Sequence, residues 1–533
     1  MDRRAFLGAL ASPLIASCEY RNGEAVFEGA LLGPDMALGH RLRDGKLPAP
    51  TEEQRIPIAI VGGGVGGLSA AWRLAKRGIS DFKLFELEEQ AGGNARSGAN
   101  AATPYPLGAH YLPLPTHESA TVRELLADLG VLIGDPAAAV PRYDERYLVH
   151  APQERLYAQG LWQEGLLPRI GASQRDADQY RRFETIVDAF KAQRGADGRK
   201  PFAIPSAQAS SDAGPRTLDA INMRDWLLQQ GLDSPRLHWY VDYGCRDDYG
   251  ARAASTSAWA GLHYFACRDG AAQDADPHSV LTWPAGNGWL VSHLLAWLAS
   301  RAPDVIRTRA MCTRLRTAGT SADIDVYLAR ENRTVRYRAD HVIWAAPAFV
   351  LARLWANPPP GFAAAAARIE VSPWLTANLT LDSLPADLGP AGLAWDNVLH
   401  DSAALGYVVA THQTISVRPG PTVLTWYWPL TDESPAAARA RLDTTGWNVW
   451  ADQILGELAK PHPGLRQQLR RLDLWRWPHA MPRPTPGFLS LPIRAMLADL
   501  RGPLHFAHAD LSGMSLFEEA NHAGVVAAQR VAR

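Results

Sequence analysis

The clearest apolar run in the chain covers residues 56–61, Ile-Pro-Ile-Ala-Ile-Val, without a polar position inside it. A run that does not alternate is typical of a parallel strand buried on both faces. Pro57 is compatible with this strand because it lies near the strand's start. Apolar residues then recur at helical spacing over residues 68–75, and Gly78 suits the end of that helix. The pattern predicts a buried strand followed directly by a helix.

A second short strand is predicted over residues 82–86, Phe-Lys-Leu-Phe-Glu, which ends in an acid. Strand, helix and strand in this order indicate an α/β fold with a parallel, doubly wound sheet of the Rossmann type.

A different alternation marks residues 425–428, Thr-Trp-Tyr-Trp. In a strand, Trp426 and Trp428 face one side of the sheet and Tyr427 faces the other. We expect at least one of these aromatic faces to line a cavity, and the alternative is plain packing within the sheet.

Six residues between the predicted strand and helix carry a glycine motif, Gly-Gly-Gly-Val-Gly-Gly over residues 62–67. In the spacing GxGxxG, Gly62 allows a tight turn, Gly64 lets the backbone approach a pyrophosphate, and Gly67 lets the helix pack closely on the strand. Glu86 follows Gly67 by 19 residues, where a carboxylate accepts hydrogen bonds from a ribose. A turn that binds nothing is the alternative, but strand, glycines, helix, strand and acid together favour a dinucleotide site.

Length and charge narrow the class of protein further. A chain of 533 residues has room for two to four domains. The 54 basic and 55 acidic residues nearly cancel, to a net charge of −1, so no basic surplus exists for binding nucleic acid. We therefore expect a small-molecule substrate and no nucleic acid as partner.

The four cysteines are scattered and form neither a disulfide framework nor a zinc motif. Cys245 and Cys267 are compatible with a disulfide and equally with two buried thiols. We expect no bound metal.

The N-terminus has the pattern of an export signal. Arg3 and Arg4 precede a short apolar stretch that ends at Cys18, like a twin-arginine signal followed by a lipoprotein cleavage box. This pattern predicts an exported, periplasmic protein with a lipid anchor at Cys18, and the alternative is an N-terminal helix. Residues 1–18 are then the signal, and residues 19–50 are expected to be a tether.

Four further segments resemble the flavin-containing amine oxidase and phytoene desaturase superfamily. They are residues 90–97 with a glycine pair, residues 105–110, residues 341–347, and residues 508–524. The resemblance implies FAD, because the family's chain returns to the cofactor at its C-terminal end. The residues that it and the glycine motif assign to cofactor binding are Gly62, Gly64, Gly66, Gly67, Glu86, Gly92, Gly93, Asn94, Arg96, Gly108, Ala109, Cys312, Ala346, Asp510 and Ser515.

The same resemblance implies a discontinuous FAD-binding domain over residues 51–115, 280–350 and 480–533. Residues 116–279 and 351–479 are then expected to form a mixed α+β substrate domain.

The catalytic candidates also rest on the resemblance. Residues 475–487 resemble the family's strand and loop beside the flavin ring, and residues 105–110 its second flavin loop. We therefore expect His479 to polarise or deprotonate the substrate, with His110 as the next candidate and Trp477 or Trp475 as a wall that excludes water. Either histidine has the alternative of a purely structural role.

Two departures from the family limit this interpretation. Many of its amine oxidases use a lysine of the substrate domain to hold a water near flavin N5, yet no lysine occurs between Lys200 and Lys460. Members with covalent flavin use a late cysteine, whereas the last cysteine here is Cys312, so the FAD is expected to be non-covalent.

Together these observations predict an exported FAD-dependent oxidoreductase. A hydride passes from an amine or a hydrophobic substrate to flavin N5, and oxygen or another acceptor reoxidises the flavin. The alternatives are a flavin-dependent desaturase or isomerase of a hydrophobic substrate, and a non-catalytic partner protein with a flavin fold. A hydrolase is disfavoured, because the chain has no GxSxG motif.

Overall fold

The computed structural model describes residues 27–532 apart from 46, 277, 387–390, 417 and 419. The predicted signal with Arg3, Arg4 and Cys18 lies outside the described residues. Within those residues, no helix has both the length and the apolar character needed to cross a membrane.

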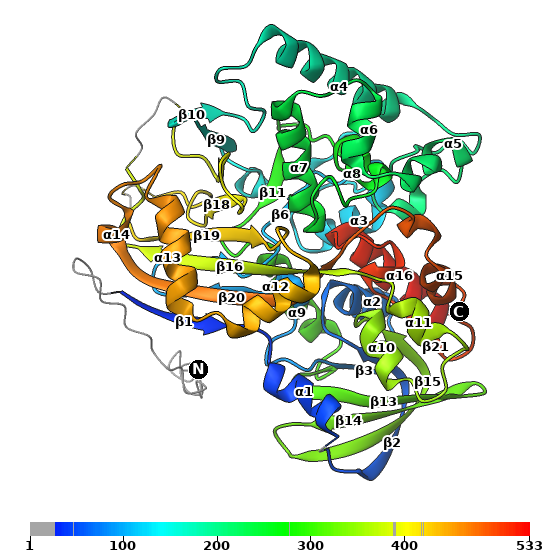
Figure 1. The fold of residues 1–533 in the computed structure, drawn as a ribbon. Coiled ribbons are helices and arrows are strands. Elements are labelled where there is room, and N and C mark those ends of the chain that lie inside the picture. Colours follow the sequence, from blue (N-terminus) through cyan, green and yellow to red (C-terminus); the bar gives the residue numbers. More distant parts are fainter. Residues whose placement is uncertain are drawn as a thin grey trace.

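The first of two large sheets contains the predicted strands at residues 56–61 and 82–86. Its order is β12-β3-β2-β15-β14-β13, and β21 pairs with the end of β15 (Figure 1, lower right). The neighbours β3, β2, β15 and β21 are parallel, as the apolar run predicted. The strands are β2 (Pro50–Val61), β3 (Phe82–Phe85), β12 (Ile306–Arg307), β13 (Ala310–Ala318), β14 (Ser321–Leu328), β15 (Arg333–Trp344) and β21 (Leu504–Phe506).

Helices cover both faces of this sheet. One core contains residues of α2 (Val65–Lys76), α9 (Gly288–Arg301) and α16 (Phe517–Val531). Another contains residues of α10 (Ala348–Leu354), α11 (Phe362–Ala366) and α15 (Pro492–Ala498). The predicted helix after the glycine motif is therefore α2, and it packs against α16 from the other end of the chain.

The second sheet has the order β1-β20-β16-β19-β18-β17-β9-β10 (Figure 1, left). Helices α12 (Pro435–Thr444) and α13 (Trp447–Leu458) lie beside it, and residues of both share a core with one of its faces. On β19, Trp426 and Trp428 belong to that core, whereas Tyr427 packs with the opposite group, so the predicted alternation is confirmed. The strands are β1 (Glu28–Leu32), β9 (Glu154–Ala158), β10 (Leu161–Glu164), β16 (Val371–Leu381), β17 (Asp396–Leu399), β18 (Gly406–Val409), β19 (Thr422–Pro429) and β20 (Leu469–Pro482).

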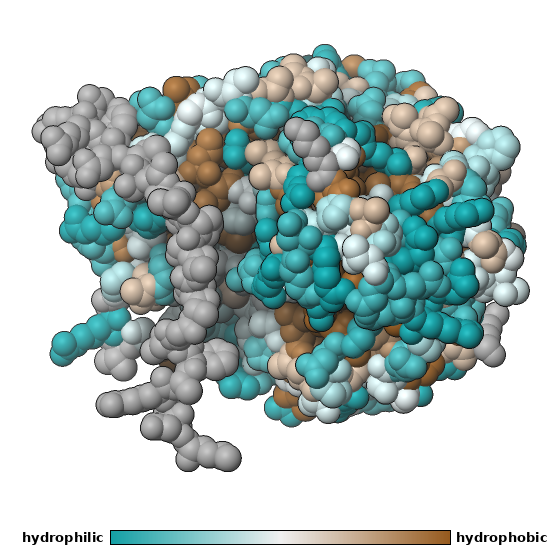
Figure 2. Space-filling model, turned by 90° about the horizontal axis from the view of Figure 1, so that it is seen from below, coloured by the Kyte–Doolittle hydropathy of each residue, from teal (hydrophilic) through white to brown (hydrophobic). Residues whose placement is uncertain are grey.

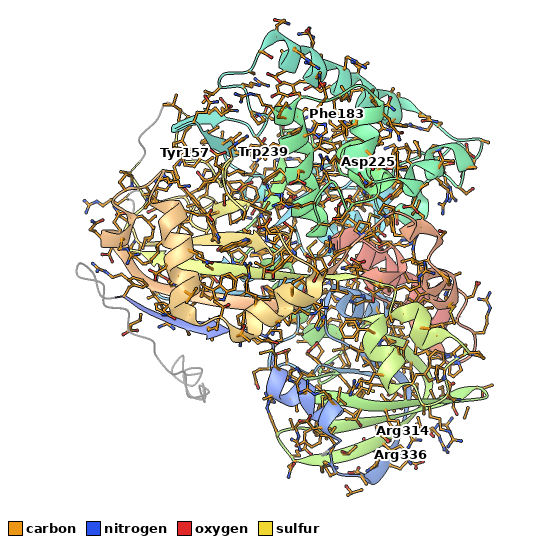
Figure 3. All side chains as sticks on the ribbon, in the orientation of Figure 1. Tyr157, Phe183, Asp225, Trp239, Arg314 and Arg336 are labelled. Carbon is orange, nitrogen blue, oxygen red and sulfur yellow. The ribbon has the colours of Figure 1, made fainter. Side chains whose placement is uncertain are left out.

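A group of helices caps the edge of the second sheet at the top of Figure 1. They are α4 (Gln174–Ala192), α6 (Met223–Gln229), α7 (Pro235–Tyr249) and α8 (Ala258–Ala266), and they share one hydrophobic core. Trp239 of α7 donates a hydrogen bond of 2.9 Å to the carbonyl of His400, directly after β17 (Figure 3). This contact fixes α7 beside β9 and β17.

Small elements complete the chain between these layers. The short strand pairs are β4 (Ser97–Ala99) with β5 (Pro104–Pro106), β6 (Tyr111–Pro113) with β11 (Val280–Thr282), and β7 (Leu132–Ile133) with β8 (Arg142–Tyr143). The remaining helices are α1 (Met36–Asp44), α3 (Ala120–Asp128), α5 (Ala213–Arg216) and α14 (Leu465–Gln468).

The predicted tether over residues 19–50 is wrong for the part that the structure describes. β1 pairs with β20 in parallel over its whole length, and Phe27 before it is buried. Asp35 caps α1 by accepting a hydrogen bond of 2.8 Å from the amide of Leu38, and its carboxylate also pairs with Arg309. Paired backbone and buried apolar side chains therefore fix this segment on the folded body.

Seen from below, polar residues cover most of the described surface, and hydrophobic residues appear in separate smaller areas (Figure 2).

Cys245, Cys267 and Cys312 are buried free thiols, so Cys245 and Cys267 do not form a disulfide.

Candidate functional site

One cavity of about 460 Å³ lies where the first sheet, the second sheet and the helical cap meet. It is lined by the ends of β2, β3, β13 and β15, by residues of β16, β19 and β20, and by residues near α7 and α8. The predicted residues that it brings together are Gly62, Gly64, Gly66, Glu86, Gly92, Gly93, Asn94, Gly108, Ala109, His110, Cys312, Ala346, Trp477, His479, Asp510 and Ser515.

The glycine turn has the geometry that a bound dinucleotide requires. Gly62 has a φ of +106°, which a residue with a side chain rarely adopts. A Cβ at Gly67 would lie 1.9 Å from the carbonyl oxygen of Gly62, so glycine at this position allows the helix to pack closely on the strand. Gly67 is not among the residues that line the cavity. A Cβ at Gly64 would meet only the Cα of Gly93, at 3.9 Å. Gly64 therefore borders open space at the N-terminus of α2, where backbone amides favour a pyrophosphate.

Glu86 stands at the end of β3 with both carboxylate oxygens engaged. Oε2 accepts from the amide of Gly63 at 2.7 Å, and Oε1 accepts from the amide of Glu88 at 2.8 Å. Burial raises the pKa of this carboxyl, against the effect of those two amides. Each oxygen keeps a second lone pair, which is the acceptor that a ribose hydroxyl needs.

Arg96, for which a cofactor contact is predicted, is not among the residues that line the cavity. Its Nε donates to the carbonyl of Gly93 at 3.1 Å, and its guanidinium lies over the rings of Trp475 and Trp477 at 5.2 and 5.3 Å. An ion pair of 3.3 Å with Glu88 completes its partners. Arg96 therefore binds the backbone of the glycine pair, and its charge is engaged by Glu88 and by the rings of Trp475 and Trp477.

Asp510, which comes from the C-terminal segment, also lines the cavity. Its Oδ2 accepts a hydrogen bond of 2.7 Å from the amide of Ala348, at the start of α10. Burial alone would raise the pKa of this carboxyl, but His508 and the Ala348 amide outweigh it and lower the pKa. Asp510 is thus an ionised acceptor.

The loop at residues 106–108 is fixed by side chains of the second sheet. Its three carbonyls accept hydrogen bonds of 2.8–3.0 Å. The donors are Asn378 to Pro106, Thr376 and the indole of Trp477 to Leu107, and the hydroxyl of Tyr427 to Gly108. The second sheet therefore holds this loop in one position.

His110 follows that loop and is enclosed by aromatic rings. It stacks on Tyr427 with 4.3 Å between ring centroids, and Tyr111 and Trp395 lie at 5.0 and 5.5 Å. Burial lowers the pKa of His110 to about 3, so the imidazole is neutral at physiological pH. It is suited to form a wall and to accept or donate a hydrogen bond as a neutral ring.

His479 occupies a different place, at the outer rim of the same cavity. Its side chain is exposed, and its ring contacts Phe349 at 5.0 Å. The structure thus separates the two histidine candidates into an enclosed position and a rim position.

A group of acids that the sequence did not predict as site residues lies at the inner end of the cavity. Tyr111 donates a hydrogen bond of 3.0 Å to Asp247, and Arg268 donates one of 2.5 Å to Asp248. Both acids lie at the end of α7, and burial raises the pKa of each, to about 7 for Asp248. The adjacent acid pair was the only available signal, and nothing in it indicated proximity to His110.

No lysine occurs among the described residues that line the cavity. Lys200 instead forms ion pairs of 3.2 Å with Glu118 and 2.6 Å with Asp269.

Comparisons with known proteins agree with this architecture. A family model described as an NAD(P)-binding Rossmann-like domain matches residues 60–129. No curated protein sequence matches the chain significantly.

Solved structures match over most of the chain. Wild-type putrescine oxidase bound to putrescine is 17% identical, with a TM-score of 0.64, 90% of this chain covered and 100% of the other. Cyclohexylamine oxidase from Brevibacterium oxydans IH-35A is 15% identical, with a TM-score of 0.63 and coverages of 90% and 98%. A fatty acid isomerase from P. acnes that produces CLA is 12% identical, with a TM-score of 0.62 and coverages of 89% and 98%. The chain has the fold of these proteins. The predicted α/β fold and the resemblance are therefore confirmed at the level of the fold.

Gly64→Val and Gly67→Val are expected to fail in different ways. Valine at Gly64 projects into open space and fills the room for a pyrophosphate, so the variant folds and does not bind a dinucleotide. Valine at Gly67 meets the Gly62 carbonyl at 1.9 Å, so that variant loses folded protein. Circular dichroism with equilibrium binding of added FAD measures both. A folded Gly64→Val protein that binds FAD like the wild type would contradict the assignment.

Proposed function

We propose that this protein is an FAD-dependent oxidoreductase that oxidises an organic amine. The observation that carries the proposal is the pair of carboxyl groups of Asp247 and Asp248, whose pKa values are raised, at the aromatic end of a cavity whose other end fits a dinucleotide. Bound FAD supplies a hydride acceptor at N5 and passes the electrons to oxygen or another acceptor.

The residues that line the cavity support FAD rather than a nicotinamide cofactor. The C-terminal segment returns to the wall with Asp510 and Ser515, and the wall continues from Glu86 to His110. The thiol of Cys312 supports non-covalent binding of the cofactor. It is buried, and burial raises its pKa to about 12, so it is a poor nucleophile.

The residues around His110 then position the substrate. His110 and Tyr427 form a rigid aromatic wall that excludes water and attracts a cation. An amine arrives as an ammonium ion and must lose one proton from nitrogen before its carbon releases a hydride. Asp247 lies in the wall with a pKa raised by burial, so its carboxylate is a base suited to take that proton. The substrate thereby gains a carbon–nitrogen double bond.

A desaturase or isomerase of a hydrophobic substrate is the second candidate. The absence of lysine from the described cavity wall favours it, and the fatty acid isomerase shares the fold. The carboxyl groups of Asp247 and Asp248 in the cavity wall favour the amine, because an apolar substrate offers neither a positive charge nor a hydrogen-bond donor to them.

Anaerobic mixing of the purified holoprotein with a panel of amines tests the proposal. At least one amine is expected to bleach the visible absorption band of the oxidised flavin. Product analysis separates the alternatives, because an isomerase leaves the substrate's oxidation state unchanged. A holoprotein that no amine bleaches would refute amine oxidation.

The two histidines are best compared side by side by stopped-flow flavin reduction. We expect His110→Ala to slow reduction by about 10²-fold, because the substrate loses its aromatic wall beside Tyr427. His479→Ala at the rim is the matched control, and it slows reduction by about 10²-fold or more only if His479 is the general base. Unchanged reduction in the His110 variant would remove His110 from the site.

We also propose that the protein is exported and anchored by lipid at Cys18. Replacement of Arg3 and Arg4 by lysine is expected to retain the protein in the cytoplasm, because the twin-arginine pair is the transport signal. Cys18→Ala is expected to abolish lipid attachment without unfolding the protein. Fractionation and mass spectrometry of the N-terminus measure both, and a cytoplasmic wild type with an intact N-terminus would contradict the proposal.

A further inference from the structure

The first described residues of the chain connect the two large sheets. β1 pairs with β20 of the second sheet, and α1 packs on the first sheet, as the blue elements of Figure 1 show. Only Gly33, Pro34 and Asp35 lie between these two elements. We call residues 27–45 the N-terminal strap, because they contact both halves of the structure before the chain enters β2.

The β1 end of the strap is fixed on the second sheet. All five residues of β1 pair with β20. A Cβ at Gly29 would lie 2.1 Å from the carbonyl oxygen of Leu472 and 2.4 Å from the ring of Trp447, so glycine allows the close approach of β1. Phe27 packs on the same ring, with 5.8 Å between centroids. None of these four residues lines the cavity, so this end of the strap is an anchor.

Asp35 fixes the start of α1 beside the end of β3. Its amide donates a hydrogen bond of 3.0 Å to Oε1 of Glu88, and its carboxylate caps α1 and pairs with Arg309. The amide of Glu88 in turn donates a hydrogen bond of 2.8 Å to Glu86. Two successive hydrogen bonds therefore connect the strap to the acid that we assign to the ribose.

Helix α1 presents one side chain to the cavity. Leu38 is buried against Met311 and Tyr327, and Arg41 donates a hydrogen bond of 2.7 Å to the hydroxyl of Tyr327. Leu42 follows Leu38 by four residues and thus lies on the same face of the helix. Among the residues of the strap, only Leu42 lines the cavity, and it is only partly buried. Its free surface is therefore available to a ligand.

The position of Leu42 corresponds to one part of a dinucleotide. Gly64 borders the space for a pyrophosphate, and Glu86 is the acceptor for the ribose next to it. The adenine ring is attached to that ribose and so lies beyond Glu86. The wall there is apolar, because Leu42, Leu87 and Met311 all line the cavity and pack in one cluster. An apolar wall of this kind suits the faces of a flat adenine ring.

We propose, on the basis of the FAD binding proposed above, that the N-terminal strap forms one wall of the adenine site. Leu42 packs against the adenine ring, and Asp35 holds α1 in the position that allows this contact. Bound FAD and the strap therefore stabilise each other, since such coupling is reciprocal. FMN lacks the AMP half of FAD, so the strap contributes nothing to its binding.

Titration of the full chain, freed of its flavin, with FAD and with FMN tests the contact. Leu42→Asn is expected to raise the Kd for FAD by about tenfold, because apolar contact with adenine is lost, and to leave the Kd for FMN unchanged. Leu47→Asn is the matched control, since Leu47 is partly buried in the same cluster and does not line the cavity. It should leave the ratio of the two Kd values as in the wild type.

Two results of this titration would overturn the inference. One is an unchanged Kd for FAD in Leu42→Asn. The other is a loss of affinity of equal size for FAD and FMN, which is the effect of general damage to the fold.

Proteolysis tests the coupling in the unmodified protein. Arg43 is exposed on α1 and Arg41 is partly buried, so trypsin cleaves after them when the helix opens. FAD is expected to slow this cleavage by about tenfold or more relative to the flavin-free chain, whereas FMN leaves its rate unchanged. Mass spectrometry of the fragments locates the cuts. Equal protection by the two flavins, or none by FAD, would contradict the coupling.

A variant at the start of α1 tests the role of Asp35. Asp35→Ala removes the helix cap and the ion pair with Arg309, so FAD should dissociate about tenfold faster from the holoprotein. Asp44→Ala, at the exposed end of the same helix, is the control and should release FAD at the wild-type rate. An unchanged rate of FAD release from Asp35→Ala would contradict the role of Asp35.

The outcomes separate this inference from the proposed function. Loss of the preference for FAD in Leu42→Asn, in a protein that no amine reduces, would support the strap and refute amine oxidation. FAD binding that does not depend on Leu42 or Asp35, in a protein that amines reduce, would refute the strap and leave amine oxidation intact. A wild-type chain that takes up no FAD would refute both.

Discussion

Close backbone packing at a few glycines is the constraint on which the first sheet, its helices and the predicted cofactor site depend. A Cβ at Gly66 would lie 2.1 Å from the carbonyl oxygen of Ala507, and one at Gly524 would lie 2.1 Å from that of Gly66. Helix α2 is therefore pressed against β21 and α16, which come from the other end of the chain. This contact joins the first and last segments of a discontinuous unit, and it aligns the N-terminus of α2 with Asp510 across one cavity.

The second constraint is the loop at residues 106–108. Its carbonyls accept hydrogen bonds from four side chains of the second sheet, so its position depends on that sheet. His110 follows directly and meets Tyr427 from β19. The aromatic wall is thus a product of the interface between the sheets, and it stands beside the acids of α7.

The sequence predicted those parts of the structure that short local patterns specify. The strand at residues 56–61, the glycine turn, the helix, Glu86 and the opposite faces of Trp426 and Tyr427 each depend on neighbours along the chain. The surroundings of Arg96 could not be predicted, because its two stacking partners come from β20, almost 400 residues away. Asp247 and Asp248 were missed for the same reason, since they reach the cavity that also holds His110 only after the two sheets and α7 have packed. The mixed polarity of residues 28–44 concealed a strand whose partner is also β20.

The cofactor content of the purified wild-type protein tests the central claim most directly. If the glycine turn, Glu86 and Asp510 hold the predicted cofactor, heat or acid should release about one FAD per chain, identified by chromatography and mass. Covalently retained flavin would contradict the non-covalent part of the account. A protein that contains no flavin and takes up none when FAD is added would contradict the account as a whole.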